Sequence, residues 1–147
     1  LGVIASVQPI HATSDMFTAD RYWGKRCEYA YAYHSLLSQG ISVRFGSDAP
    51  VESFNPFQGL HAAVTRQRQY GQPSPHGWYP QQRVTLQQAI DAYTQPLPGD
   101  RKTDLIAVGM PADFIALNQD PYQVDPSQLA GLSPDMTVVA GEVVYNR

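Results

Sequence analysis

Two polar residues of this sequence each follow a short apolar run that is typical of a strand. Asp48 follows residues 41–45 in the stretch ISVRFGSD, and His11 follows residues 3–7 in the stretch VIASVQPIH. In parallel α/β sheets, the loops that leave the carboxyl ends of the strands share one edge, where active sites are usually built. A carboxylate and an imidazole at such an edge can transfer protons or bind a metal ion. We therefore expect Asp48 and His11 to lie close together.

Each of these residues also has a simpler explanation. Asp48 stands two residues before a proline, where an aspartate commonly forms a turn and its carboxylate accepts a backbone N–H. His11 could equally be a loop residue with a satisfied hydrogen bond. A hydrolytic zinc site uses three or more protein ligands and leaves one position open for water. The other histidines do not complete such a set, because His34 and His61 fall within expected helices and His76 falls in a loop rich in proline and glycine.

A strand, a helix and a second strand are predicted around these residues. Residues 3–7 and 41–45 are the two strands. Between them, residues 20–39 carry apolar side chains at three- and four-residue steps and are followed by Gly40, which predicts a helix with a glycine cap. Because this order is nearly always wound right-handed with its strands parallel, we expect a parallel sheet.

Two further helices and several strands follow. Asn55-Pro56 predicts a capped helix start, and Thr85-Leu86-Gln87-Gln88 is a capping box that opens another helix. Strand-like runs then occupy residues 105–108, 114–117, 136–139 and 142–145, and Ala140-Gly141 is typical of a tight hairpin turn. The chain is therefore expected to divide near residue 96 into a βαβα part and a small all-β part.

The composition excludes several classes of protein. With 147 residues, 43% of them hydrophobic, the chain can form one ordinary globular core. Its net charge of -3 indicates neither a nucleic-acid-binding nor a membrane-binding protein, and Arg66 and Arg68 are typical of a solvated helix face. No apolar run approaches the ~20 residues that span a bilayer. The single cysteine, Cys27, excludes an internal disulfide and favours packing in a cytoplasmic protein. Because the chain begins with Leu1 inside a strand-like run, we expect a fragment.

At these residues the sequence resembles the amidohydrolase superfamily, in the branch of the YtcJ-like metal-dependent hydrolases and N-substituted formamide deformylase. The resemblance is carried by five stretches in the family's order. They are IASVQPIHATSDM at residues 4–16, YAYHSLLSQGISVRFGSDAPVESFNPFQGLHAAVTRQ at 31–67, TLQQAIDAYT at 85–94, VGMPADFIALNQDP at 108–121 and TVVAGEVVY at 137–145.

The resemblance implies a fold and a set of roles. Residues 1–95 would be the last two strand–helix units of an α/β metal-dependent hydrolase of the (β/α)8 (TIM) barrel type, and residues 96–147 would be part of a small β-sandwich domain. Asp48 would lie at the end of strand eight, where it would bind a metal ion and act as general base and then as general acid. Zn²⁺, as one or two divalent ions, would activate the attacking water. His11, in the QP-x-H pattern of strand seven, would contact the substrate or its oxyanion.

The implied reaction is hydrolysis of a C–N bond in a small-molecule amide or formamide. The family's HxH pair, its bridging ligand and the histidines of strands five and six have no counterpart in this sequence, so the fragment alone is expected to be inactive and to retain no metal. Two parallel strands cannot close a barrel, and we expect the fragment to pair with the missing N-terminal part of the same protein or to self-associate. The alternative function is a non-catalytic interaction domain that keeps the architecture and uses the rim loops only for binding.

Overall fold

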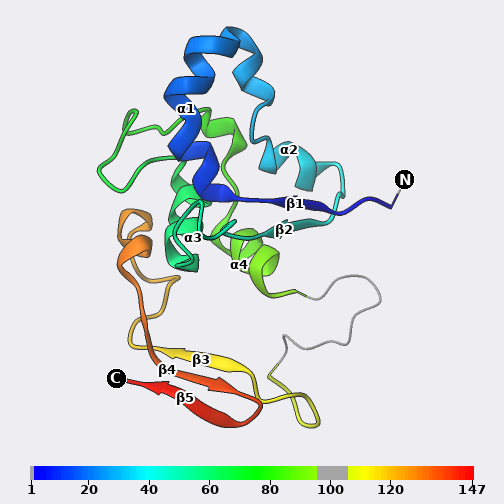
Figure 1. The fold of residues 1–147 in the computed structure, drawn as a ribbon, viewed down its shortest axis with the longest axis vertical. Coiled ribbons are helices and arrows are strands. Elements are labelled where there is room, and N and C mark those ends of the chain that lie inside the picture. The colour runs from blue at the N-terminus through cyan, green and yellow to red at the C-terminus, as the bar shows by residue number, and fades with distance from the viewer. Residues whose placement is uncertain (1, 96–105) are drawn as a thin grey trace. The chain divides into compact units, whose positions relative to one another are not determined.

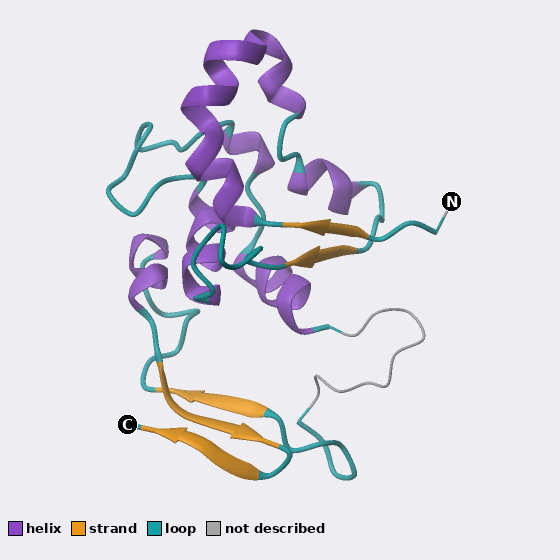
Figure 2. Cartoon of the chain, in the orientation of Figure 1, coloured by secondary structure: helices purple, strands orange, loops and turns teal. Residues whose placement is uncertain are grey.

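The structure is a computed structural model that describes residues 2–95 and 106–147. The described residues form two compact units (Figure 1). The first unit reaches to Tyr93 and also takes in Asp125–Gly131, and the second unit holds the rest. Helices and strands occur together in the chain, as the cartoon in Figure 2 shows, which confirms the mixed α/β class.

The sheet of the first unit has two short parallel strands, β1 (Ala5–Val7) and β2 (Val43–Phe45). They lie side by side in Figure 1, with Ala5 opposite Val43 and Val7 opposite Phe45. Both strands were predicted, but each is shorter at its start than the apolar pattern indicated. Val43 and Phe45 are buried, because alternate side chains of a strand point to the same face.

The helix between the strands begins much earlier than predicted. Helix α1 (Pro9–Trp23) starts directly after β1 and places Pro9 at its first position. Proline stops a strand because it cannot donate to the ladder, but its fixed φ also suits the first turn of a helix. The sequence analysis took Pro9 only as the end of the strand and not as the start of a helix.

The predicted continuous helix over residues 20–39 is wrong. The structure has a 3₁₀ segment, η1 (Gly24–Tyr29), and then a separate short helix, α2 (Tyr33–Ser38). Gly24 and Tyr31 have φ values of 55° and 54°, which a right-handed helix cannot include. The apolar side chains at helical steps therefore belong to three elements instead of one.

The two predicted helix starts are confirmed. In α3 (Pro56–Thr65), the side-chain oxygen of Asn55 accepts a hydrogen bond from the backbone N–H of Phe57 at 2.9 Å. In α4 (Leu86–Thr94), Thr85 and Gln88 make the reciprocal hydrogen bonds of a capping box, at 3.1 and 2.9 Å. The 3₁₀ segment η2 (Pro80–Gln82) lies between these helices.

One segment of the later sequence belongs to the first unit. The 3₁₀ segment η3 (Pro126–Gly131) packs against α3 and buries Leu129 almost completely. Asp125 supports its start, because a carboxylate oxygen accepts the backbone N–H of Ser127 at 2.8 Å. The sequence analysis placed all of residues 96–147 in the all-β part, and the contact between η3 and α3 shows where that division differs from the structure.

The second unit contains an antiparallel sheet in the order β3 (Phe114–Leu117), β4 (Pro134–Val139) and β5 (Glu142–Asn146). The predicted hairpin turn is confirmed, with φ values of 51° at Ala140 and 83° at Gly141. The strand predicted at residues 105–108 is not formed over residues 106–108, where Ile106 and Val108 are exposed; residue 105 lies outside the described residues.

The core of the first unit contains a buried arginine, so the prediction of a solvated face at Arg66 is wrong. Arg66 ends α3 in the left-handed conformation and its side chain is 0% exposed. Its guanidinium donates to the carbonyl oxygens of Trp78 and Tyr31, both at 3.0 Å, and lies over the rings of Tyr33 and Trp78. These partners are distant in sequence, and local charge patterning therefore could not reveal them.

Among the described residues, no helix combines the length and the apolar character needed to cross a membrane. Cys27 is fully buried as a free thiol, as its packing role predicted.

Candidate functional site

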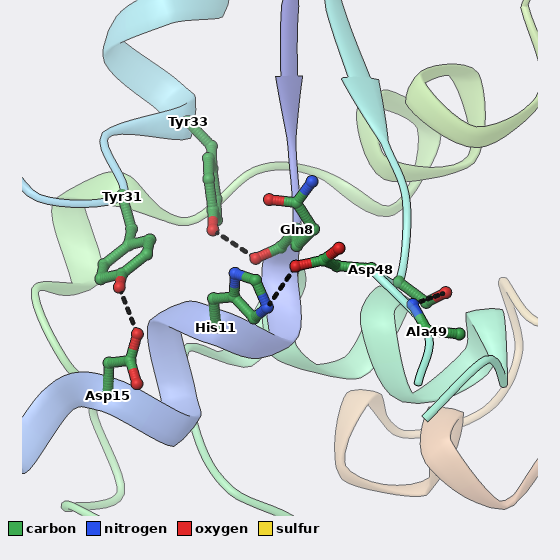
Figure 3. A network of polar contacts seen from close by, with 8 residues as sticks. Gln8, His11, Asp15, Tyr31, Tyr33, Asp48 and Ala49 are labelled. Carbon is green, nitrogen blue, oxygen red and sulfur yellow. Dashed lines mark hydrogen bonds and ion pairs between the residues drawn. The ribbon is translucent and has the colours of Figure 1, made fainter. Parts of the chain in front are cut away.

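Asp48 and His11 face each other where β1 and β2 end. The Nε2 atom of His11 lies 3.8 Å from Oδ2 of Asp48 (Figure 3). Val7 and Phe45 are paired at the ends of the strands, and so the two chains leave the sheet side by side. His11 then sits in the first turn of α1, and Asp48 sits in the loop after β2. The structure thus brings together the two residues that the sequence analysis placed on one rim.

The backbone of Asp48 forms a turn, but its carboxylate is not used to hold that turn. Asp48 has a φ of 57°, a left-handed conformation that aspartate tolerates better than most residues. Its carbonyl oxygen accepts the N–H of Val51 at 2.8 Å, and the hydroxyl of Ser47 accepts the N–H of Ala49 at 3.3 Å. Within the described residues the carboxylate accepts no backbone N–H, and its side chain is 55% exposed. The turn-forming explanation therefore accounts for the main chain of Asp48 but not for its side chain.

His11 is more enclosed than Asp48. Its side chain is 21% exposed, and Nε2 is buried without a hydrogen bond to any described residue. The 3.8 Å to Asp48 is an ion-pair distance and is too long for a hydrogen bond. A buried polar atom without a partner is uncommon in proteins and calls for an explanation, such as a catalytic role or a bound ion. The Nε2 atom is thus a candidate contact for a ligand at this edge.

Two tyrosines that the sequence analysis did not select as site residues make hydrogen bonds to helix α1 or its N-cap, on either side of His11 in the sequence. The Tyr33 hydroxyl donates to the carbonyl oxygen of Gln8 at 2.8 Å, and the Tyr31 hydroxyl donates to Oδ2 of Asp15 at 2.5 Å (Figure 3). Burial is the largest cause that raises the pKa of both phenols, so each remains a hydrogen-bond donor at neutral pH. The pattern assigned Tyr31 to a helical stripe, and no spacing in the sequence links it to Asp15.

The remaining histidines lie apart from this pair. His34 is exposed and bonds to Ser38 within α2, and His76 is exposed in its loop. His61 is 2% exposed in α3 and borders an open cavity of about 460 Å³, where burial lowers the pKa of its imidazole. His34 and His61 thus lie in helices and His76 in a loop, as the sequence analysis expected.

The loop that contains His76 is anchored by a buried tryptophan. Trp78 is 5% exposed, and its indole N–H donates to the carboxylate of Asp20 at 3.0 and 3.1 Å. The buried Trp78 thus ties this loop to α1.

The donor atoms at the edge match part of a metal site. An imidazole nitrogen and a carboxylate oxygen are ordinary ligands of Zn²⁺. Across residues 2–95 and 106–147, no group of three or more His, Cys, Asp and Glu side chains is arranged to hold a metal ion. Asp48 and His11 by themselves supply two such donor groups, fewer than the three or more protein ligands that a hydrolytic zinc site uses.

Comparisons with known proteins were made for the whole chain. The model of a family described as the amidohydrolase family matches residues 1–145. YtcJ of Bacillus subtilis (strain 168), which its name assigns provisionally to the amidohydrolases, is 33% identical over 150 residues, covering 99% of this chain and 28% of YtcJ. Protein LONG AFTER FAR-RED 3 of Arabidopsis thaliana is 28% identical over 151 residues, covering 99% of this chain and 25% of that protein. No solved structure matches the chain significantly. The chain thus spans less than a third of the length of these relatives.

Proposed function

The chain belongs to the amidohydrolase family, and from this we propose that it is the C-terminal segment of a metal-dependent hydrolase that cleaves a C–N bond in a small-molecule amide or formamide. The observation that carries the proposal is the exposed Asp48 carboxylate, which faces His11 at the ends of two parallel strands. Active sites of parallel α/β proteins lie at this edge.

The proposal includes an architecture. The units β1–α1 and β2–α3 would be the last two strand–helix units of a (β/α)8 barrel, and the antiparallel sheet would be part of a β-sandwich domain. The parallel pairing of β1 and β2 and the helix that follows each strand support the first assignment. The three-stranded antiparallel sheet of the second unit supports the second.

Asp48 would be the carboxylate that transfers protons in this reaction. A bound divalent cation, Zn²⁺ or a pair of such ions, would acidify water and polarise the amide carbonyl, and Asp48 is the residue of this chain best placed to hold it. Asp48 would accept the proton of the attacking water as general base and give it to the leaving nitrogen as general acid. Its 55% exposure lets the carboxylate reach groups beyond its own loop.

His11 would contact the substrate. Its buried Nε2 makes no hydrogen bond to the described residues, so a protonated Nε2 can donate to the carbonyl oxygen, where negative charge develops during attack. The same atom lies beside Asp48, which would keep the substrate carbonyl close to the group that moves the proton.

The remaining ligands and the rest of the barrel would come from the N-terminal part of the complete protein, and by itself the chain would be inactive. This follows from the partial donor set and from the share of the relatives that the chain spans. A cytoplasmic location is also proposed, on the basis of the single buried free cysteine.

The test uses the complete protein purified with its metal. Asp48→Asn keeps the size of the side chain but removes its basicity, and we expect amide or formamide turnover to fall by roughly 10²- to 10⁴-fold. The matched control is Asp120→Asn, which changes an exposed carboxylate of the second unit and should leave turnover unchanged. Metal content measured by mass spectrometry should show a stoichiometric divalent ion in the unmodified protein. A complete protein that binds no divalent ion and hydrolyses no amide would support the interaction-domain alternative instead.

A further inference from the structure

We propose that Tyr33 is a positioning residue for His11, and that the buried Arg66 holds Tyr33 and Tyr31 in the conformation that this role needs. The inference rests on the proposed function in one respect, since it takes His11 as the residue that contacts the substrate. It concerns how this chain fixes the orientation of that imidazole relative to Asp48.

Tyr33 contacts the end of β2 and the residue that follows β1, next to the two segments that carry Asp48 and His11. Its hydroxyl donates to the carbonyl oxygen of Gln8, which also accepts the backbone N–H of His11 at 3.2 Å. Its ring packs edge-on against Phe45, the last residue of β2, with 5.6 Å between the ring centroids. Tyr33 is only 1% exposed. One rigid side chain therefore links the turn that carries His11 to the strand that leads to Asp48.

The first turn of α1 has no side-chain cap, and the Tyr33 hydroxyl is a contact from outside the helix that holds its N-cap residue. Gln8 occupies the N-cap position, and its side chain makes no capping hydrogen bond. The Tyr33 hydroxyl restrains the Gln8 carbonyl from outside the helix, at a sequence distance of 25 residues. His11 follows within the same turn, so a shift of Gln8 would move the imidazole as well.

Tyr31 restrains the same face of α1 one turn further on. Asp15 is four residues after His11, which places both on one side of the helix. Tyr33 thus restrains the chain at Gln8, before His11, and Tyr31 restrains it at Asp15, after His11, as Figure 3 shows.

Arg66 fixes the segment that carries both tyrosines. It donates to the carbonyl oxygen of Tyr31, whose φ of 54° is unfavourable for a tyrosine, and it lies over the Tyr33 ring with 5.5 Å to the ring centroid. A buried guanidinium is costly unless its surroundings compensate for lost water. Here carbonyl oxygens accept from Nε and Nη1 and aromatic rings face the group, while Nη2 is buried without a hydrogen bond to the described residues. The core arginine thereby sets the positions of two side chains that reach the rim.

The experiment compares Tyr33→Phe with Tyr93→Phe in the complete protein. Tyr33→Phe keeps the ring packed on Phe45 and removes only the hydroxyl that restrains Gln8. Tyr93 is also a tyrosine packed edge-on against Phe45, but its hydroxyl donates no hydrogen bond to Gln8 in the described structure, so its variant is the matched control. We expect kcat/KM to fall about tenfold or more in Tyr33→Phe and to stay within twofold of the unmodified enzyme in Tyr93→Phe.

A second readout does not depend on activity. Acylation of His11 by diethyl pyrocarbonate, followed by peptide mass spectrometry, reports how accessible the imidazole is, and the exposed His76 serves as an internal reference. We expect the His11 rate relative to His76 to rise at least threefold in Tyr33→Phe, and to rise less in Tyr31→Phe, which removes the other restraint. Tyr93→Phe should leave the ratio unchanged.

The outcomes separate the inference from the proposed function. If Tyr33→Phe lowers only the melting temperature, while kcat/KM and the His11 acylation ratio stay the same, Tyr33 is merely structural and the inference is wrong. If the unmodified protein shows no hydrolase activity, the proposed function fails, and the acylation ratio still decides whether Tyr33 positions His11. If Tyr33→Phe does not fold, Tyr31→Phe tests the same network through its half-exposed ring, and an unchanged ratio there overturns the inference.

Discussion

The exposure and the hydrogen bonds of individual side chains determine what chemistry they can perform in this chain. Asp48 and His11 face each other, yet the carboxylate is largely exposed and the imidazole nitrogen is buried without a hydrogen bond in the described structure. His34 and His61 are both helical, but only His61 is enclosed. Residue type therefore identifies candidates, and burial determines which of them can titrate or bind.

His61 leads to a prediction about pH. Burial lowers the pKa of its imidazole below the ordinary value of 6.5, and the one charged side chain among the residues that line its cavity in the described structure is Arg68. Above pH 6.5 the imidazole is neutral in both states and stability is complete. As the pH falls below 6.5, the unfolded chain takes up a proton that the folded chain resists, so the free energy of unfolding decreases.

His61→Gln should remove this contribution. In urea unfolding of the complete protein at pH 7.5 and 5.5, the decrease in midpoint on acidification should be smaller for His61→Gln than for the unmodified protein. The exposed His34 offers the control, because His34→Gln should retain the full decrease. Equal decreases in all three proteins would show that His61 does not cause the acid sensitivity.

At the level of secondary structure, the packing of α4 against α3 requires the glycine at position 59. A Cβ atom added at Gly59 would collide with the hydroxyl of Tyr93 and would lie 2.9 Å from the ring carbon Cζ. Replacing glycine by alanine normally favours a helix by roughly 1 kcal/mol. Here the collision should outweigh that gain, since overpacking costs about 1–3 kcal/mol.

Gly59→Ala should therefore lower the melting temperature of the complete protein, and Tyr93→Phe should restore part of the loss by removing the closest atom. The two changes should be non-additive, as expected for residues in contact. Gly131→Ala is the control, because a Cβ atom at Gly131 meets nothing within 4 Å. A stabilising Gly59→Ala would mean that α3 and α4 move apart at little cost.

At the level of the whole molecule, the described residues expose strand edges and large apolar side chains. In the described part of the first unit the parallel sheet has two strands, so β1 and β2 each have one edge without a partner strand. Val3 and Phe54 are 70% and 84% exposed. Unpaired strand edges and exposed apolar side chains favour association with another chain.

We predict that the 147-residue chain, expressed alone, self-associates at micromolar concentration. Sedimentation velocity should show species larger than a monomer, and co-expression with the N-terminal part proposed above should replace them with one defined complex. A monodisperse monomer of the chain alone would contradict the prediction and would show that these surfaces are tolerated in water.

Features that depend on neighbouring residues could be predicted from the sequence. The cap at Asn55, the capping box at Thr85 and the turn at Ala140-Gly141 each form through contacts within a few residues. The two strands and the polar residues that follow them could be predicted for the same reason. The alternation of apolar and polar residues, and the glycine and proline residues that end a strand, are local signals.

Features that depend on residues far apart in the sequence became visible in the three-dimensional fold. The helix expected over residues 20–39 is interrupted at Tyr31, whose carbonyl oxygen is held by Arg66. Tyr33 restrains Gln8 across 25 residues, and η3 returns to pack on α3. The physical reason is that buried hydrogen bonds and ring contacts between remote segments outweigh local helical preference, and a linear pattern records only the local preference.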